Sequence, residues 1–361
     1  MDISREIQQT ILHTELLKSK LLTGLHCNPR DPNANRKMAI AYTGRSCIGI
    51  PIFNSENIPI YCLRFWKQDD VLKSRKKEKE TCINISEVLN KLVKRHDLKF
   101  FVQYQFLNEG LVIDEQRIIP CILMDWAGET LADKLYPGHD SNGKPKSKPS
   151  KDQYKMMADS FAFMCQKMKE AGIVHGDLSS NNIVVTNDWH LKLIDYDSIY
   201  IPSEDVVNTQ SSVGTKGFQH PGRFSAKKKS TTDDNFSQLI IYLTLLTYYY
   251  NPQLNNVQDK IEEMLFSDSD LQSADKFRDS LAYKEIKKFG NQELLFYLEI
   301  IENSLSKPYT EVPFLCDLIN ERKEEILQVQ LANFCGICGH HFDNNTDKYC
   351  PDCGAKREKI I

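Results

Sequence analysis

Three polar residues between positions 175 and 197 could together carry out phosphoryl transfer. Asp177 and Asn182 lie in the segment HGDLSSNNIVV, and Asp195 lies in the segment LIDYD. Transfer of a phosphoryl group from ATP requires a carboxylate that orients or deprotonates the acceptor hydroxyl, together with oxygen ligands for Mg²⁺. Mg²⁺ takes hard oxygen ligands from one or two protein groups and from the phosphates. One carboxylate could therefore act as the base while the other two side chains hold the metal.

The elements around these residues are expected to bring them to one place. A helix is predicted over 153–172, and short strands are predicted over 183–185 and 191–195. Asp177 and Asn182 would then lie on the loop between the helix and the first strand, and Asp195 would end the second strand. The alternative is purely structural: Asp177 and Asn182 cap turns, and Asp195 is a polar residue at a strand end.

The order and spacing of these segments resemble the protein-kinase-like superfamily. His-Gly-Asp-Leu-Ser-Ser-Asn-Asn resembles the catalytic loop H-R-D-L-x-x-x-N, and Asp-Tyr-Asp takes the place of D-F-G. The resemblance implies that Asp177 is the catalytic base, Asn182 a metal ligand and Asp195 the main metal ligand. It also implies ATP and Mg²⁺ (or Mn²⁺) as cofactors, and it covers residues 37–325.

Further segments extend the resemblance. VGTKGFQHPGR (213–223) is similar to the end of an activation segment, and Asp234 in D-x-F-S would brace the catalytic-loop backbone. ILMDWAGETL (122–131) is similar to the fifth strand and hinge of a kinase. Met124 would be the gatekeeper, and the backbone of Asp125, Trp126 and Ala127 would face adenine. Taken together, these motifs most resemble those of bacterial Ser/Thr kinase-like proteins, some of which carry zinc ribbons.

The residues expected to bind the phosphates depart from the kinase pattern. Arg64 stands where kinases have a lysine, and it can still contact phosphate, with Lys67 as a weaker candidate for the same role. The glycine-rich loop GRSCIG is degenerate, and only Gly44 is carried over from it. Glu87 is the expected helix partner of Arg64, with Glu80 just upstream as the alternative.

The catalytic loop also differs from the pattern. Gly176 replaces the arginine that binds an activation-loop phosphate in many kinases, so loop phosphorylation is not expected to be the switch through that route. Ser179 replaces the lysine that contacts the γ-phosphate. Asp197 replaces the glycine of D-F-G and could be a further metal ligand or a turn residue, of which the turn is favoured.

Four cysteines near the end of the chain predict a structural zinc site. Two C-x2-C-G segments contain the four residues Cys335, Cys338, Cys350 and Cys353. Two thiolate pairs complete the tetrahedral shell of Zn²⁺, which leaves no open position for catalysis. The rival interpretation, a redox dithiol pair, lacks a thioredoxin-like context.

The strand and helix patterns predict an α+β, bilobal kinase-like fold with a C-terminal zinc ribbon. The expected divisions are an N-terminal amphipathic helix and linker (1–36), an N-lobe (37–126), a C-lobe (127–325) and a helix end with the ribbon (326–361). The first helix is expected over 3–25, the N-lobe helix over 84–95, and a buried helix over 236–250. A polar, Pro- and Gly-rich loop is expected over 137–152.

Composition narrows the possible functions. The chain has 361 residues, 41% hydrophobic and 26% charged, with a net charge of −3, so no strong positive field favours nucleic acid. No membrane span or signal peptide is expected, which indicates a cytoplasmic protein.

We expect a Ser/Thr-type protein kinase with a protein substrate; the alternatives are a pseudokinase scaffold and a small-molecule kinase. The zinc ribbon and the N-terminal helix are candidate protein-interaction elements.

Overall fold

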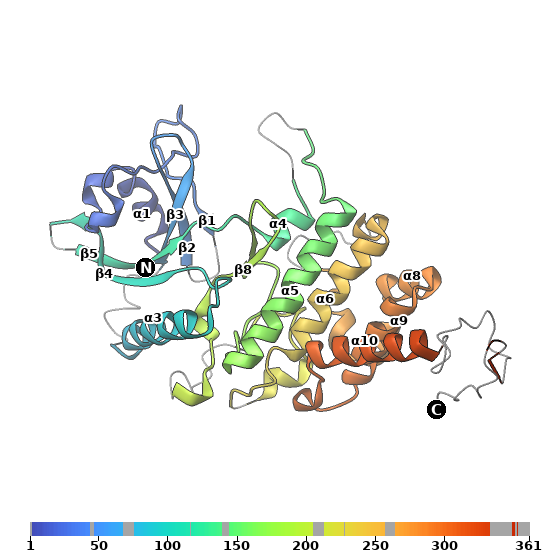
Figure 1. The fold of residues 1–361 in the computed structure, drawn as a ribbon. Helices are drawn as coiled ribbons and strands as arrows, with labels where there is room; N and C mark the ends of the chain where they lie inside the picture. Colours follow the sequence, from blue (N-terminus) through green and yellow to red (C-terminus); the bar gives the residue numbers. More distant parts are fainter. Residues whose placement is uncertain are drawn as a thin grey trace.

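A β-sheet with two flanking helices lies beside a larger helical part (Figure 1). The computed structural model describes residues 2–43, 47–67, 76–115, 117–138, 144–204, 213–226, 228–256, 264–332, 349–350 and 352. The mixture of an antiparallel sheet and helices agrees with the predicted α+β class and with a kinase-like fold.

The larger sheet is antiparallel and has the strand order β1-β2-β3-β5-β4. Its strands are β1 (Tyr42–Thr43), β2 (Cys47–Phe53), β3 (Pro59–Trp66), β4 (Tyr104–Asp114) and β5 (Arg117–Asp125). Strand β4 begins only at Tyr104, and the apolar residues before it pair elsewhere. Phe100 and Val102 instead exchange backbone hydrogen bonds with Leu193, at 2.8 and 3.2 Å. This pairing ties the sheet to the strand that precedes Asp195.

The two faces of the sheet contribute to different cores because side chains alternate along a strand. On β5, Cys121 and Leu123 join a cluster with the N-terminal segment, whereas Ile122 and Met124 join the main core. Helix α3 (Lys76–His96) packs on the main-core side, and it begins earlier than the predicted 84–95.

The N-terminal segment is not the single helix expected over 3–25. It forms α1 (Ser4–Thr10) and two 3-10 turns, η1 (Thr14–Leu16) and η2 (Lys20–Leu22). The helix ends at Thr10, and the Lys18 N–H donates to the Gly110 carbonyl on β4 at 3.1 Å. The buried isoleucines of α1 cover one sheet face (Ile3, Ile7, Ile11). The segment therefore packs on the chain's own sheet.

The helical part is built around two buried helices. Helix α5 (Lys151–Ala171) starts at a Ser150–Gln153 capping box and ends at Gly172 in the left-handed conformation, close to the predicted limits. Helix α6 (Asn235–Tyr250) is buried along almost its whole length, as predicted. Around them lie α4 (Leu131–Leu135), α7 (Ala274–Asp279), α8 (Leu281–Phe289), α9 (Gln292–Ser304) and α10 (Leu315–Ala332).

A second, three-stranded sheet lies next to the catalytic-loop candidates, which flank its strands. It has the order β6-β7-β8, formed by β6 (Glu129–Thr130), β7 (Ile183–Val185) and β8 (Leu191–Leu193). Strand β7 has the predicted bounds, whereas β8 ends at Leu193, two residues before the predicted end at position 195. In the described part of the chain, no helix combines the length and the apolar character that crossing a membrane requires.

Candidate functional site

The catalytic-loop backbone is held by a buried carboxylate. Asp234, which lies directly before α6, accepts hydrogen bonds from the N–H groups of His175 at 2.6 Å and Gly176 at 2.8 Å. Burial raises the pKa of Asp234, while the nearby His175 and Arg223 lower it. The predicted bracing role of Asp234 is confirmed by these two contacts.

The ring of His175 joins the catalytic loop to the end of β8. Its Nε2 lies 2.9 Å from the Ile194 carbonyl, and its Nδ1 accepts from the N–H of Asp177 at 3.3 Å. Since a carbonyl can only accept, Nε2 is the donor in this contact, and both ring nitrogens are engaged. The ring is fully buried, so this link fixes the loop relative to the segment that bears Asp195.

Asp177 and Asn182 are brought together as expected. The Asn182 amide nitrogen donates to the Asp177 backbone carbonyl at 2.8 Å, which leaves the amide oxygen of Asn182 available to a cation. The carboxylate of Asp177 accepts at Oδ1 from both the N–H (2.7 Å) and the hydroxyl (2.8 Å) of Thr215. One carboxylate oxygen is thus fixed by the 213–223 segment, and no described group bonds to Oδ2.

Asp195 follows β8 in a left-handed backbone conformation, with φ 64° and ψ 77°. Such a conformation is uncommon for a residue other than glycine and is often found where a site imposes it. The Asp195 carboxylate lies 2.9 Å from Nη1 of Arg64, which projects from β3. The structure therefore places the expected phosphate-binding cation directly beside the expected metal ligand.

Arg64 has a second and closer carboxylate partner. Its Nη2 donates to Oδ2 of Asp197 at 2.7 Å, and its Nη1 donates to Oδ1 at 3.2 Å. Desolvation alone would lower the pKa of Arg64, but Asp195 and Asp197 raise it well above its usual value. Burial raises the pKa of Asp197, and the charge of Arg64 opposes that rise. Asp197 does lie in a 3-10 turn (Tyr196–Ser198), as favoured, but its carboxylate has this additional role.

Tyr196, between the two aspartates, points into the core. Its hydroxyl donates to the carbonyls of Val102 at 3.0 Å and Leu193 at 2.5 Å, and its side chain is fully buried. Its ring packs against Phe101 and edge-on to His175. With Tyr196 fixed inward, the carboxylates on either side of it face Arg64.

The prediction that Glu87 pairs with Arg64 is wrong. Glu87 is exposed on α3, and the described ion pairs of Arg64 are with Asp195 and Asp197. The side chain of Glu80 lies outside the described residues.

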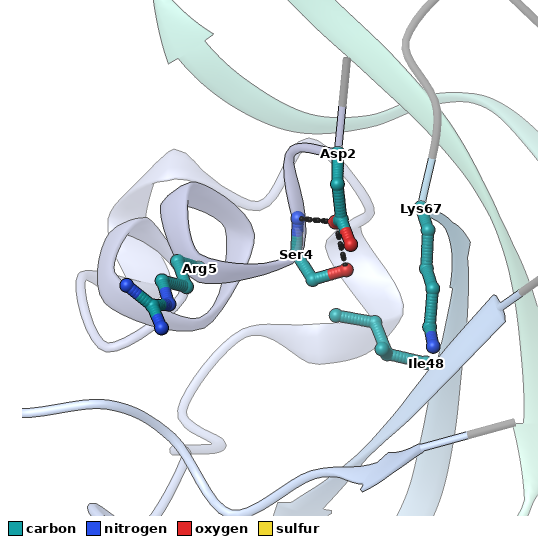
Figure 2. A pocket seen from close by; sticks show the side chains of 5 residues that line it. All are labelled: Asp2, Ser4, Arg5, Ile48 and Lys67. Carbon is teal, nitrogen blue, oxygen red and sulfur yellow. Dashed lines mark hydrogen bonds between the residues drawn. The ribbon is translucent and has the colours of Figure 1, made fainter.

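Lys67 lines a hollow of about 300 Å³ beside α1, together with Asp2, Ser4, Arg5 and Ile48 (Figure 2). It therefore faces the N-terminal segment and does not replace Arg64.

The absence of a catalytic-loop arginine has a steric cause. Gly176 has φ +80°, and a Cβ built on it would lie 2.2 Å from the Ser198 carbonyl oxygen. The fully buried Arg223 instead reaches the loop from the 213–223 segment, donating to the Gly176 carbonyl at 2.8 Å and to Asp233 at 3.2 Å. The sequence offered Arg223 only as part of a motif, and its contact with the loop was not predicted.

The hinge candidates lie at the end of β5 and just beyond it. Met124 is buried in the main core, and the Trp126 N–H donates to the Ile60 carbonyl at 2.8 Å. Ala127 makes no hydrogen bond to any described residue, so its backbone is available to a ligand.

Asp125 lies opposite Tyr61 in the sheet, and desolvation raises the pKa of Asp125. Tyr42, which the sequence did not single out, packs on Trp126 with ring centroids 5.8 Å apart.

Four of the predicted site residues lie outside the described part of the chain. Gly44 lies outside the described residues, as do Cys335, Cys338 and Cys353, while Cys350 is described and buried. Within the described ranges, no group of three or more His, Cys, Asp or Glu side chains gathers around a point. The zinc site therefore stays a prediction.

The donor set at the catalytic loop fits a magnesium ion. Asn182 and Asp195 offer an amide and a carboxylate oxygen, which are the hard ligands that Mg²⁺ prefers. The 37% exposure of the Asp195 side chain leaves it accessible. Asn182 and Asp195 would hold the metal, and the guanidinium of Arg64 lies 2.9 Å from the Asp195 carboxylate.

Comparison with known proteins agrees with this site. Residues 121–204 match the RIO domain family, an atypical protein-kinase-like family whose members bind ATP and act as phosphotransferases. The matched residues include the hinge candidates, the catalytic loop and all three of the Asp-Tyr-Asp residues. This segment of the chain is thus similar to the RIO domain. No curated protein matches the chain.

Proposed function

We propose that the protein is an ATP- and Mg²⁺-dependent phosphotransferase of the Ser/Thr protein kinase type. The observation that carries the proposal is the double hydrogen bond from Thr215 to one oxygen of Asp177. It fixes the carboxylate of the catalytic-loop candidate and leaves the other oxygen for an acceptor hydroxyl. The sheet part and the helical part would be the two lobes of a kinase, and the bacterial Ser/Thr kinase-like group stays the finer resemblance.

The positions of the residues support the roles proposed for them. The free oxygen of Asp177 would accept the proton of an incoming hydroxyl group. When bound, Mg²⁺ supplies charge neutralisation at the phosphates, and Asn182 and Asp195 would hold it. Arg64 would contact the phosphates by its guanidinium, and the backbone of Asp125 to Ala127 would face adenine.

A pseudokinase scaffold is the second candidate. The observation that favours it is the contact of Arg64 with the Asp195 carboxylate at 2.9 Å, because the same carboxylate would have to engage the metal. In that case the domain would bind partners without transferring phosphate. Its binding elements would be the segment 335–353 and the outer face of the N-terminal segment.

The acceptor identifies the class of enzyme. The full chain is incubated with γ-labelled ATP and Mg²⁺, together with generic protein substrates in one arm and small hydroxyl compounds in the other. We expect label on serine or threonine of a protein. Label on small hydroxyl compounds alone would make the protein a small-molecule kinase, and label on nothing, the chain itself included, would favour the scaffold.

We also propose a structural Zn²⁺ held by Cys335, Cys338, Cys350 and Cys353. The support is the spacing of the two C-x2-C-G segments, since two thiolate pairs satisfy a tetrahedral ion. Metal analysis of protein purified without chelator should find one zinc per chain, and Cys335→Ser should lose it. A metal-free wild-type protein would refute this proposal.

A further inference from the structure

The guanidinium of Arg64 makes its most complete contact with Asp197. The pair has two N–H···O bonds, at 2.7 and 3.2 Å, whereas Asp195 contributes one close contact at 2.9 Å. Two parallel bonds between a guanidinium and a carboxylate fix both the position and the orientation of the arginine. Asp197 is therefore the partner that sets where the plane of the Arg64 side chain lies.

Arg64 depends on such a partner because of where it lies. Its side chain is only 11% exposed, and a charged group removed from water is costly unless a counterion compensates it. Asp195 cannot serve this purpose throughout the proposed reaction, since it would also hold the metal. A carboxylate that is not a metal ligand is needed to keep Arg64 in place, and Asp197 has that geometry.

We infer, on the basis of the proposed function, that Asp197 is the positioning residue that holds Arg64 toward the nucleotide phosphates, in place of a glutamate on α3. The arginine at position 64 and the aspartate at position 197, which both depart from the kinase pattern, then have a common reason, because each is the partner of the other. A lysine at position 64 would present a single point charge, whereas the guanidinium fork can contact Asp197 with both terminal nitrogens and Asp195 with one of them.

This arrangement changes what controls the position of Arg64. Asp197 follows β8, and that segment is fixed by the inward-pointing Tyr196 and by the link from His175 to Ile194. The cation and the metal ligand are consequently held by one short segment, 195–197. A displacement of α3, which carries the exposed Glu87, would leave the Arg64–Asp197 pair intact.

The affinity for nucleotide distinguishes the role of Asp197 from the roles of Glu87 and Glu80 on α3. Isothermal titration calorimetry of the full chain with a non-hydrolysable ATP analogue and Mg²⁺ is the measurement. Asp197→Asn, which keeps the shape and removes the charge, should raise the Kd at least about tenfold. The matched control Glu87→Gln and the rival Glu80→Gln should each stay within about twofold of wild type. Wild-type affinity in Asp197→Asn, or a larger loss in either helix variant, would overturn the inference.

A stability cycle tests the pair without any nucleotide. Asp197→Asn should lower the Tm of the otherwise unchanged chain by at least about 2 °C, because Arg64 loses its paired carboxylate. In the Arg64→Gln background the same change should raise the Tm or leave it unchanged, since it relieves repulsion between Asp195 and Asp197. Equal losses in both backgrounds would contradict the pairing. If wild type binds no nucleotide, the proposed function fails, and this cycle still decides whether Asp197 holds Arg64.

Discussion

Arg223 donates a hydrogen bond to the backbone carbonyl of Gly176 at 2.8 Å, and so joins the 213–223 segment to the catalytic loop. The same arginine contacts Gln219 and lies 3.2 Å from Asp233, with both members of that ion pair only 1% exposed. An activation-loop phosphate is not needed to make this connection. The loop and the segment are therefore held together by the guanidinium of Arg223.

Loss of Arg223 should be among the most destabilising single changes. Arg223→Met leaves Asp233 buried without its cation and the Gly176 carbonyl without its donor, which should cost about 3–5 kcal/mol of unfolding free energy. Urea unfolding monitored by tryptophan fluorescence measures the change. The matched control is Arg278→Met, whose 46%-exposed side chain pairs with Glu302, and it should cost less than about 1 kcal/mol. Similar losses in both variants would refute the structural role of the buried pair.

Gly176 should tolerate no side chain. Gly176→Ala would place a methyl group 2.2 Å from the Ser198 carbonyl, in addition to the strain at φ +80°, so we expect a loss above about 3 kcal/mol. Gly172→Ala is the control, since Gly172 has φ +66° but no atom near the added methyl group. That control should cost about 1–2 kcal/mol. Equal losses in urea unfolding would show that the close approach to Ser198 is relieved easily.

Lys229 should make stability rise at alkaline pH. Its Nζ donates to the carbonyls of Ser198 at 2.8 Å and Ile199 at 3.1 Å. Burial, with a smaller effect of Arg223, lowers the pKa of Lys229 from its ordinary 10.5 to about 8. Between these values the unfolded chain binds more protons than the folded one, so stability increases with pH. Below pH 8 both states are charged and the cost of burying the charge is present in full.

The difference between wild type and Lys229→Met isolates this effect from other titrating groups. From pH 7 to pH 10 the unfolding free energy of wild type should gain about 2–3 kcal/mol relative to the variant. Urea unfolding at several pH values gives the difference. A constant difference, or one that falls with pH, would contradict the lowered pKa.

Thr215 should affect turnover more than stability. Thr215→Val keeps the shape and the backbone N–H contact at 2.7 Å but removes the hydroxyl that Asp177 accepts from at 2.8 Å. One oriented hydrogen bond to a charged group accounts for about a tenfold loss in kcat. Thr215→Ser retains the hydroxyl and should recover most of the rate. If the serine variant is as impaired as the valine variant, the hydroxyl does not orient Asp177.

The sequence predicted the elements that local patterns determine. The α5 and α6 helices, the β7 and β8 strands and the bracing by Asp234 follow from apolar periodicity, capping residues and motif spacing. Contacts across the fold were not predictable in this way. Glu87 was the natural choice of partner for Arg64 by motif, but Asp197, 133 residues from Arg64 along the chain, has that position.

The N-terminal segment shows another limit of periodicity. Ile3, Ile7 and Ile11 have helical spacing, and the apolar residues after them suggested that the helix continues. The edge of β4 competes for the backbone at Lys18, so the chain leaves the helix to bond with the sheet. A tertiary hydrogen bond of this kind overrides the local preference, and a single sequence does not reveal it.

The most direct test of the proposed function is Mg²⁺-dependent transfer of label from γ-labelled ATP by the full chain. Wild type should transfer label, while Asp177→Asn and Asp195→Ala should each reduce the rate at least about a hundredfold. Asp188→Asn, a control at an exposed aspartate in the turn between β7 and β8, should transfer at the wild-type rate. Transfer that survives unchanged in Asp177→Asn and Asp195→Ala, or its absence from wild type with every acceptor, would contradict the account.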